Sequence, residues 1–97
     1  MTFEWDTHKN QLNIRKHGID FTDVPEMFDY PMLVMIDDRE DYVEDRWMGI
    51  GLLKHVVAVV VFVERHDDVI RIISARKATY YESKTYQEEL AHRLGKT

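Results

Sequence analysis

The sequence predicts an α+β domain in which helices pack an antiparallel β-sheet, in the order β-α-α-β-β-β-β-α. Three observations support this class. Four segments have the apolar or alternating pattern of strands, segments with capping residues at their ends indicate helices, and 97 residues with 44% hydrophobic content suffice for one core. We therefore expect a single domain over residues 1–97. The strand segments are residues 32–36, 46–53, 56–63 and 69–75.

Capping residues define the first helix. Phe3 to Trp5 is a short strand candidate, and Asp6 then stands where a helix N-cap is expected. Thr7 to Lys16 contain neither Gly nor Pro, and Gly18 follows at a position that favours left-handed backbone. The sequence therefore predicts a helix from Thr7 to Lys16.

Two more helices are expected. A short helix should run from Thr22 or Asp23 to Phe28, because Pro25 is tolerated only in a first turn and Pro31 stops any continuation. Residues 79–82, Thr-Tyr-Tyr-Glu, form a capping box that starts the last helix at residue 80. An apolar stripe at residues 86, 90 and 94 would pack this helix.

The strand segments differ in how their faces are covered. Val56 to Val63 is apolar on both faces, as expected of a central strand. Gly49 and Gly51 share one face of the preceding strand and leave room for another segment to lie over them. Residues 65–68 supply the turn before Val69 to Ala75.

Composition excludes several classes of protein. There are no cysteines, the longest apolar run has eight residues, and the five histidines lack metal-ligand spacing. We therefore expect no metal, no cofactor and no membrane span, and a reducing cytoplasm suits the chain. The net charge of −5 argues against a direct DNA-binding regulator, which would also need a basic recognition helix.

Charge is distributed in blocks. Residues 19–46 hold two Lys or Arg and ten Asp or Glu, whereas Val69 to Lys84 holds four basic side chains and one acid. The basic block can bind an anion locally, and either block can equally be a solvated surface.

One face of the first helix is a candidate binding surface. Lys9, Asn13, Lys16 and His17 fall at i, i+4, i+7 and i+8, so they share one side of the helix. A ligand carrying phosphates could lie along them. The alternative is a solvated face on which His17 interacts with the helix dipole.

The last hairpin is a candidate catalytic site. A four-residue turn would place Glu64 opposite Val69 and Phe62 opposite Arg71, so Glu64 and Arg71 would share a face. Such a pair could act as proton acceptor and phosphate clamp, or simply as a surface ion pair. A register slip of one residue would put them on opposite faces.

Arg76 and Lys77 lie between the last strand and the Thr79 cap, where exposed amides at a helix start attract anions. Strict alternation sends Arg71 and Arg76 to opposite faces, but the chain leaves the strand near Ala75. The direction of Arg76 therefore stays open.

Three segments together resemble the BrnT toxin family. They are Phe3-Glu4-Trp5-Asp6 with Lys9, Asn13 and Lys16-His17-Gly18, then Phe28-Asp29 with Pro31, and then the segment Arg71-Ile72-Ile73-Ser74-Ala75-Arg76-Lys77-Ala78. The last segment is the most specific. The resemblance implies a bacterial, cytoplasmic ribonuclease toxin with a RelE-like fold, which works without a metal and blocks translation. It also implies a BrnA-type antitoxin that neutralises the toxin and binds DNA, so that the toxin meets DNA only through its partner.

Combined with the residue patterns, the resemblance suggests site residues. The candidate catalytic residues are His17, Glu64, Arg71 and Arg76, and the candidate RNA-binding residues are Lys9, Asn13, Lys16 and Lys77. Proton transfer is assigned to either His17 or Glu64.

The sequence also departs from the family. Many relatives carry further arginines near the start of the last helix, where this chain has Tyr80, Tyr81 and Ser83, and tyrosines can stack bases instead. The acidic block, including Asp37, Asp38 and Glu40, is a candidate dock for a basic segment of the antitoxin. The alternative function is a non-catalytic module that pairs with the antitoxin and tunes promoter repression.

Overall fold

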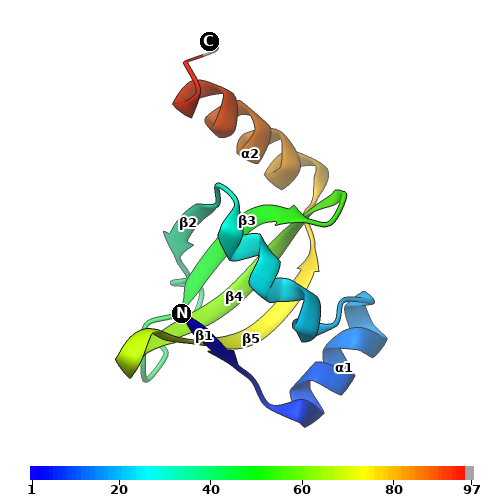
Figure 1. Ribbon diagram of the computed structural model, residues 1–97, viewed down its shortest axis with the longest axis vertical. Helices are drawn as coiled ribbons and strands as arrows, with labels where there is room; N and C mark the ends of the chain where they lie inside the picture. The colour runs from blue at the N-terminus through cyan, green and yellow to red at the C-terminus, as the bar shows by residue number, and fades with distance from the viewer. Residues whose placement is uncertain (96–97) are drawn as a thin grey trace.

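The computed structural model describes residues 1–95 and shows strands and helices along most of the chain (Figure 1). No helix in this range is long and apolar enough to cross a membrane. In chain order the elements are β1 (Thr2–Glu4), α1 (Thr7–His17), the 3-10 helix η1 (Phe21–Asp29), β2 (Leu33–Ile36), β3 (Trp47–Leu53), β4 (Val56–Arg65), the 3-10 turn η2 (His66–Asp68), β5 (Val69–Lys77) and α2 (Tyr80–Arg93).

The five strands form one sheet in the order β1-β5-β4-β3-β2. Neighbouring strands from β2 to β5 are antiparallel, but β1 pairs with β5 in parallel. The sheet is therefore mixed, and the prediction of an antiparallel sheet is only partly correct. A three-residue strand carries no local signal for its partner, and β1 finds β5 through contacts 67 residues apart.

The caps of the two α-helices are as predicted. The Asp6 side chain accepts a hydrogen bond from the Lys9 amide, and Gly18 has a φ of 72°. The capping box between Thr79 and Glu82 is complete, and α2 starts at Tyr80. Local sequence therefore defines these ends.

The second helix differs from the prediction because it is a 3-10 helix. It has nine residues and includes Pro25. A 3-10 helix has three residues per turn, so Phe21, Val24 and Met27 all lie on one side, and all three are buried. The apolar spacing of three is the feature that matches this geometry.

The two faces of the sheet are covered differently. On the side that we call the η1 face, η1 packs over Val60, Phe62 and Ile72 (Figure 1). On the opposite side, the α2 face, Tyr86 of α2 packs against Ile50 and Val59.

Met32 lies over the two glycines of β3. A Cβ atom at Gly49 would collide with the Met32 Sδ, and one at Gly51 would lie 3.4 Å from the Met32 Cγ. The predicted room over these glycines is thus confirmed, and the segment before β2 fills it.

A β-bulge shifts the register between β4 and β5. Val61 pairs with Ser74, but its neighbour Phe62 pairs with Ile72, so Ile73 is an extra residue on β5. Side chains on either side of such an insertion no longer follow strict alternation along the strand.

The predicted register of this hairpin is wrong by one residue. Arg65, and not Glu64, pairs with Val69, and Val63 pairs with Arg71. The connection is a three-residue turn over His66–Asp68, with φ of 62° at Asp67 and 60° at Asp68, instead of the four residues assumed. Asp tolerates this left-handed backbone better than most residues, which allows the shorter turn.

Candidate functional site

Arg71 and Arg76 lie on the same face of the sheet. Arg76 pairs with Val59, which packs against α2, and Arg71 pairs with Val63. Val59 and Val63 are four residues apart on β4 and therefore point to the same face. Directly paired residues share a face, so both arginines belong to the α2 face. The bulge at Ile73 produces this arrangement, because five residues along an unbroken strand would separate them.

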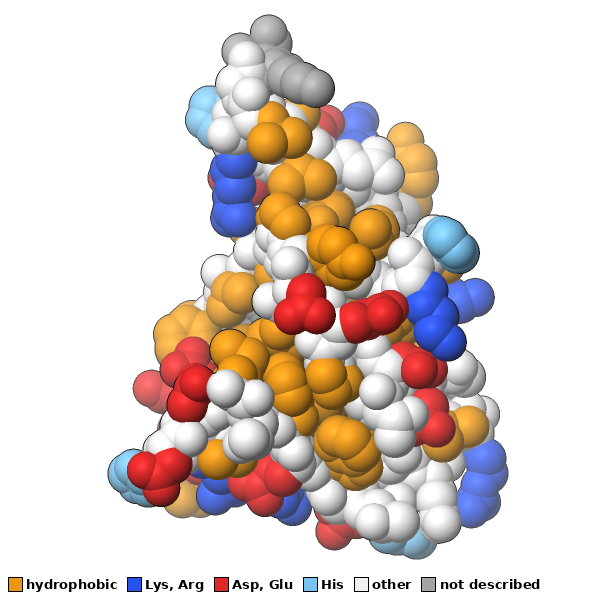
Figure 2. All heavy atoms as spheres, viewed as in Figure 1, with side chains coloured by type: hydrophobic (Ala, Val, Ile, Leu, Met, Phe, Trp, Pro, Cys, Tyr) orange, Lys and Arg blue, Asp and Glu red, His pale blue; other side chains and the backbone are white. Residues whose placement is uncertain are grey.

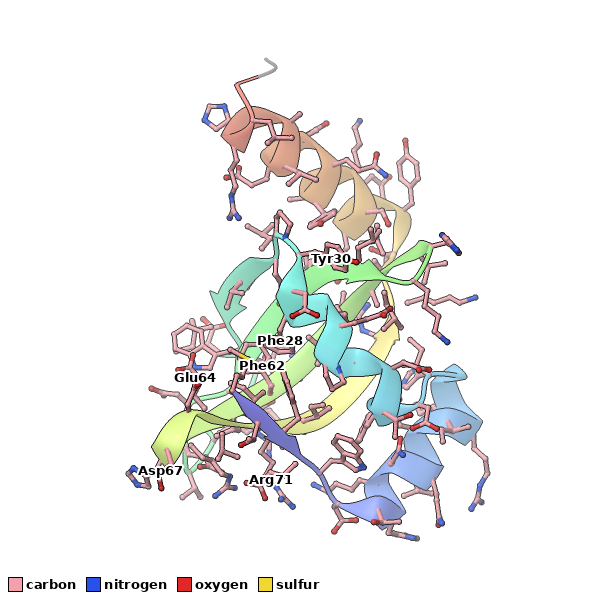
Figure 3. All side chains as sticks on the ribbon, in the orientation of Figure 1. Phe28, Tyr30, Phe62, Glu64, Asp67 and Arg71 are labelled. Atoms are coloured by element: carbon pink, nitrogen blue, oxygen red, sulfur yellow. The ribbon has the colours of Figure 1, made fainter. Side chains whose placement is uncertain are left out.

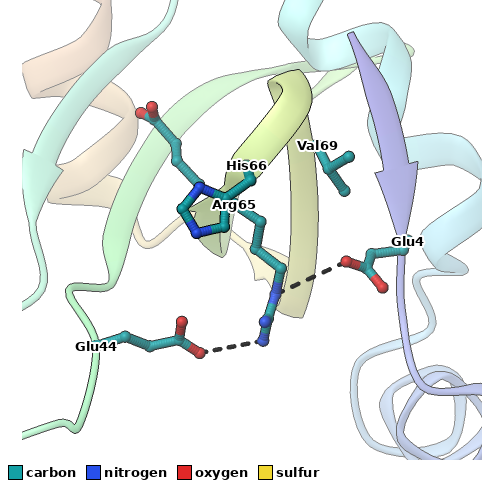
Figure 4. A pocket seen from close by; sticks show the side chains of 6 residues that line it. Glu4, Glu44, Arg65, His66 and Val69 are labelled. Atoms are coloured by element: carbon teal, nitrogen blue, oxygen red, sulfur yellow. Dashed lines mark hydrogen bonds and ion pairs between the residues drawn. The ribbon is translucent and has the colours of Figure 1, made fainter.

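Arg71 belongs to a chain of ion pairs at one end of the α2 face. Its Nη1 donates to Glu4 Oε2 at 3.0 Å, and Glu4 and Arg71 are register partners on β1 and β5. Arg65 links Glu4 to the 37–46 loop, with its Nη2 3.1 Å from Glu44 Oε1 and its Nε 3.7 Å from Glu4 Oε1. Figure 4 shows this bridge beside a hollow of about 580 Å³, which Glu64, His66 and Val69 also line.

Arg76 is held at the N-terminus of α2. Its Nη1 and Nη2 donate to the two carboxylate oxygens of Glu82 at 2.7 and 2.9 Å. The same carboxylate accepts a hydrogen bond from the Thr79 amide. The hydrogen bonds from Arg76 lower the pKa of Glu82 to about 2, against the opposing effect of burial. Glu82 therefore stays ionised and orients the guanidinium.

The 37–46 loop carries two more arginines. Arg39 donates to both carboxylate oxygens of Asp37, at 2.7 and 2.8 Å, and these hydrogen bonds lower the pKa of Asp37. The guanidinium of Arg46 lies 4.2 Å from the centre of the Tyr42 ring, and its Nε is buried without a hydrogen-bond partner among the described residues. The hydrogen bonds to Glu82 raise the pKa of Arg76, and the positive charge of Arg39 acts in the opposite direction.

Asp37 does not fit the predicted antitoxin contact. Its side chain is fully buried, with both oxygens bound by Arg39. Its role is to hold the loop. Asp38 and Glu40 of the same predicted set are exposed and remain accessible to a partner.

Asn13 does not fit the predicted RNA contact either. It is the buried polar residue of α1, and its side chain takes up three backbone hydrogen bonds. The amide donates to the carbonyls of Ile19 and Ala75, and Oδ1 accepts from the Ala75 amide. Because β1 covers β5 only from Val69 to Arg71, Asn13 replaces a neighbouring strand further along this edge.

The other predicted RNA-binding residues are accessible. Lys9 and Lys16 are exposed on α1, and His17 is half-buried at its last position. Lys77 is exposed at the end of β5, where its carbonyl accepts a hydrogen bond from Arg76 Nη1 at 3.2 Å.

Glu64 does not share a face with Arg71, as the predicted register required. It pairs with Ile70 and lies on the η1 face, beyond Phe62 (Figure 3). Although Glu64 also lines the hollow beside Arg65 at the end of the sheet, the register puts it on the face opposite Arg71 and Arg76. Of the four candidate catalytic residues, only Arg71 and Arg76 are therefore brought to one face by the register.

Glu4, Arg65 and Arg46 were not predicted as site residues. Glu4 and Arg65 join the α2 face through contacts that are distant in sequence, such as the 67 residues between Glu4 and Arg71, whereas Arg46 contacts the nearby Tyr42. The one signal in the sequence was that Glu4 belongs to a strand candidate. Without the order of the strands in the sheet, this signal could not identify Arg71 as its partner.

These features define a small α+β protein with an arginine-rich face on its sheet. A sequence model of the family described as "Ribonuclease toxin, BrnT, of type II toxin-antitoxin system" matches residues 5–82. The chain therefore belongs to the BrnT family of ribonuclease toxins.

A solved structure supports the same assignment. The 1.1 Å crystal structure of the Brucella abortus ribonuclease toxin BrnT superposes with a TM-score of 0.67 and is 32% identical in sequence. The alignment covers 81% of this chain and 97% of the Brucella chain. No curated protein matches the sequence.

Proposed function

We propose that this chain is a metal-independent endoribonuclease toxin that binds RNA on the α2 face of its sheet. The observation that carries the proposal is that the bulge at Ile73 brings Arg71 and Arg76 to one face. Two oriented guanidinium groups can bind phosphate and stabilise the charge that gathers on it during cleavage. We also propose that the fold is RelE-like.

The proposed reaction is attack of an RNA 2′-oxygen on the adjacent phosphorus. Arg71 and Arg76 keep N–H groups beyond those that bind Glu4 and Glu82, because a guanidinium has five donors. These groups would hold the phosphate while the bond to the 5′-oxygen breaks.

The proton acceptor in this proposal is Glu4 or His17. Glu4 is the carboxylate bound to Arg71, on the face where the phosphate would lie. Glu82 is a weak acceptor because its pKa is about 2, and Glu64 lies on the opposite face. His17, half-buried at the last position of α1, keeps its predicted role.

Exposed tyrosines extend the proposed RNA site. Tyr80 and Tyr81 begin α2, directly after the Arg76 segment, and both side chains are about three-quarters exposed. Aromatic rings can stack on bases with little sequence preference. They would take the place of the arginines that many relatives carry there.

In the cell, the activity of the proposed toxin would depend on its antitoxin. A BrnA-type antitoxin would hold the toxin inactive and link it to promoter DNA. Released toxin would cut RNA in the bacterial cytoplasm and block translation.

Cleavage of a defined RNA in EDTA tests the proposal. We expect the purified chain to cut, and Arg76→Ala and Arg71→Ala to lose about 100-fold or more in rate, as for removal of a transition-state donor. Arg15→Ala, an exposed position on α1, is the control. Circular dichroism would match the variants for folding.

Two results would contradict the proposal. Unchanged cleavage in both arginine variants would remove the α2 face as the site. If wild-type protein leaves RNA intact, with and without ribosomes, and its expression without the antitoxin does not arrest growth, the chain is a non-catalytic module that pairs with the antitoxin.

A further inference from the structure

An apolar hollow lies on the η1 face, across the sheet from the arginines. It has a volume of about 250 Å³ and lies between η1, β2 and the β4–β5 hairpin. Phe28, Tyr30, Met32, Val34 and Phe62 line it, and Tyr30 and Val34 are about half exposed. Figure 2 views this side of the molecule, where hydrophobic side chains gather and acidic side chains lie around them.

The adjacent strand β2 has an open edge. Within residues 1–95 it pairs only with β3. Just after β2, the Asp37 amide donates to the carbonyl of Arg46, the residue before β3. Because the direction of the backbone groups alternates along a strand, Met35 and Leu33 also point their N–H and C=O groups to β3. Val34 and Ile36 therefore direct their N–H and C=O groups outwards, away from the sheet.

Met32, the residue before β2, makes a hydrogen bond that agrees with this geometry. The Met32 carbonyl, also two positions from Val34, accepts from Arg93 of α2 and not from β3. The open stretch thus begins after Met32 and extends to Ile36. Its side chains are apolar, with Val34, Met35 and Ile36 all at least 40% exposed. Edges of this kind pair readily with another extended chain.

Carboxylates lie around this surface. Glu64 lies at the rim of the hollow and has no ion pair among the described residues, whereas Asp68, which lines the same hollow, pairs with the N-terminal ammonium group of Met1 at 2.9 Å. Ile36 leads directly into the loop that carries the exposed Asp38, Glu40 and Asp41. A segment paired with β2 would therefore lie between two acidic areas.

We propose that an extended segment of the antitoxin adds to β2 as a sixth strand and inserts an apolar side chain into the hollow. This inference rests on the proposed function, which supplies the antitoxin. The negative rim selects a segment with Lys or Arg beside its apolar anchor, and the open backbone of Val34 and Ile36 supplies main-chain hydrogen bonds. The surface is distinct from the α2 face where RNA is proposed to bind.

Binding of the full-length cognate antitoxin to the full chain, measured by calorimetry, tests this inference. Val34→Pro removes the outward N–H while leaving the β3-facing groups of β2, and Val34→Ala is its matched control. We expect Val34→Pro to bind at least tenfold more weakly than Val34→Ala. Tyr30 lines the hollow but lies outside the sheet, so Tyr30→Ala should also weaken binding. This variant tests the inference even if Val34→Pro does not fold.

A charge-reversed pair tests the rim. Glu64→Lys should weaken binding and reduce its salt dependence, whereas Glu88→Lys on the exposed side of α2 should not. The Val34, Tyr30 and Glu88 variants should keep the RNA cleavage rate of the wild type. Binding is measured directly, so a chain that fails to cut RNA still tests the docking surface.

Two outcomes would overturn the inference. One is equal affinity in Val34→Pro and Val34→Ala together with no effect of Tyr30→Ala or Glu64→Lys. The other is that the chain alone forms a dimer by analytical ultracentrifugation that Val34→Pro dissociates, because the occupant of the β2 edge would then be a second copy.

Discussion

Asn13 is a polar side chain that takes the place of a missing strand. Its amide group satisfies both the N–H and the C=O of Ala75 at a point where β5 has no strand beside it. It also binds the Ile19 carbonyl, which fixes the turn after α1. A buried residue with this many backbone partners contributes to folding and not to ligand binding.

Asn13→Ala should therefore destabilise the protein by about 2–3 kcal/mol, because it leaves buried backbone groups of Ala75 and Ile19 without partners. Gln11→Ala, at an exposed position of α1, should change stability by less than about 0.5 kcal/mol. Urea unfolding followed by circular dichroism measures both. Equal, small losses in the two variants would show that water satisfies the β5 edge.

Glu82 makes the free energy of unfolding depend on pH in the acidic range. Its pKa is about 2 in the folded chain against an ordinary value of 4.5, mainly because Arg76 donates to it. The stabilisation is therefore present above about pH 4.5 and is lost as the pH falls towards 2.

Glu82→Gln should lose on the order of 1–2 kcal/mol at pH 7, a value reduced for partial exposure of the pair. Gln can still complete the capping box, so the change reports mainly on the ion pair with Arg76. The difference between wild type and variant should shrink from pH 5 to pH 2. A difference in unfolding free energy that stays constant over this range would contradict the assigned pKa.

At the scale of elements, the irregular parts of β3 and β5 arrange the two faces. The bulge in β5 keeps Ile72 and Ala75 in the η1 core while Arg71 and Arg76 lie on the other side. The glycines of β3 let Met32 lie close to the sheet, and Met32 in turn forms a wall of the apolar hollow.

Gly49→Ala should cost about 1–3 kcal/mol, because the new methyl group collides with Met32 in a packed region. Gly51→Ala should cost less than about 1 kcal/mol, since its nearest neighbour would be in ordinary van der Waals contact at 3.4 Å. Thermal unfolding of the two variants compares them directly. A larger loss for Gly51→Ala would contradict this packing.

Across the whole molecule, the two sides of the sheet differ in chemistry, because the α2 face carries arginines paired with carboxylates. The chain carries a net charge of −5, yet arginines gather on the α2 face while the η1 face has an apolar hollow with carboxylates at its rim. The proposed binding of RNA by an acidic protein would depend on that local gathering of arginines.

The affinity for a cleavage-resistant RNA should therefore fall with salt, by a slope of about −0.7 in log–log form per phosphate contact. Arg71→Ala and Arg76→Ala should each reduce the magnitude of this slope by about 0.7, and Arg15→Ala should leave it unchanged. Fluorescence anisotropy over a series of salt concentrations measures the slope. An unaltered slope in both arginine variants would place the phosphates elsewhere.

The elements whose signals are local could be predicted from the amino-acid sequence. The caps at Asp6 and Thr79, the apolar run of β4 and the glycines of β3 all rest on neighbouring residues, and each behaves as predicted. The BrnT family could likewise be recognised from short segments of sequence.

Contacts in the folded chain, and no local pattern, set the partner of β1, the bulge at Ile73 and the burial of Asn13. It thereby separated Glu64 from Arg71 and brought Arg71 together with Arg76. The physical reason is that a single inserted residue or a shorter turn exchanges the faces of a strand, while changing nothing in the local pattern from which a strand is predicted.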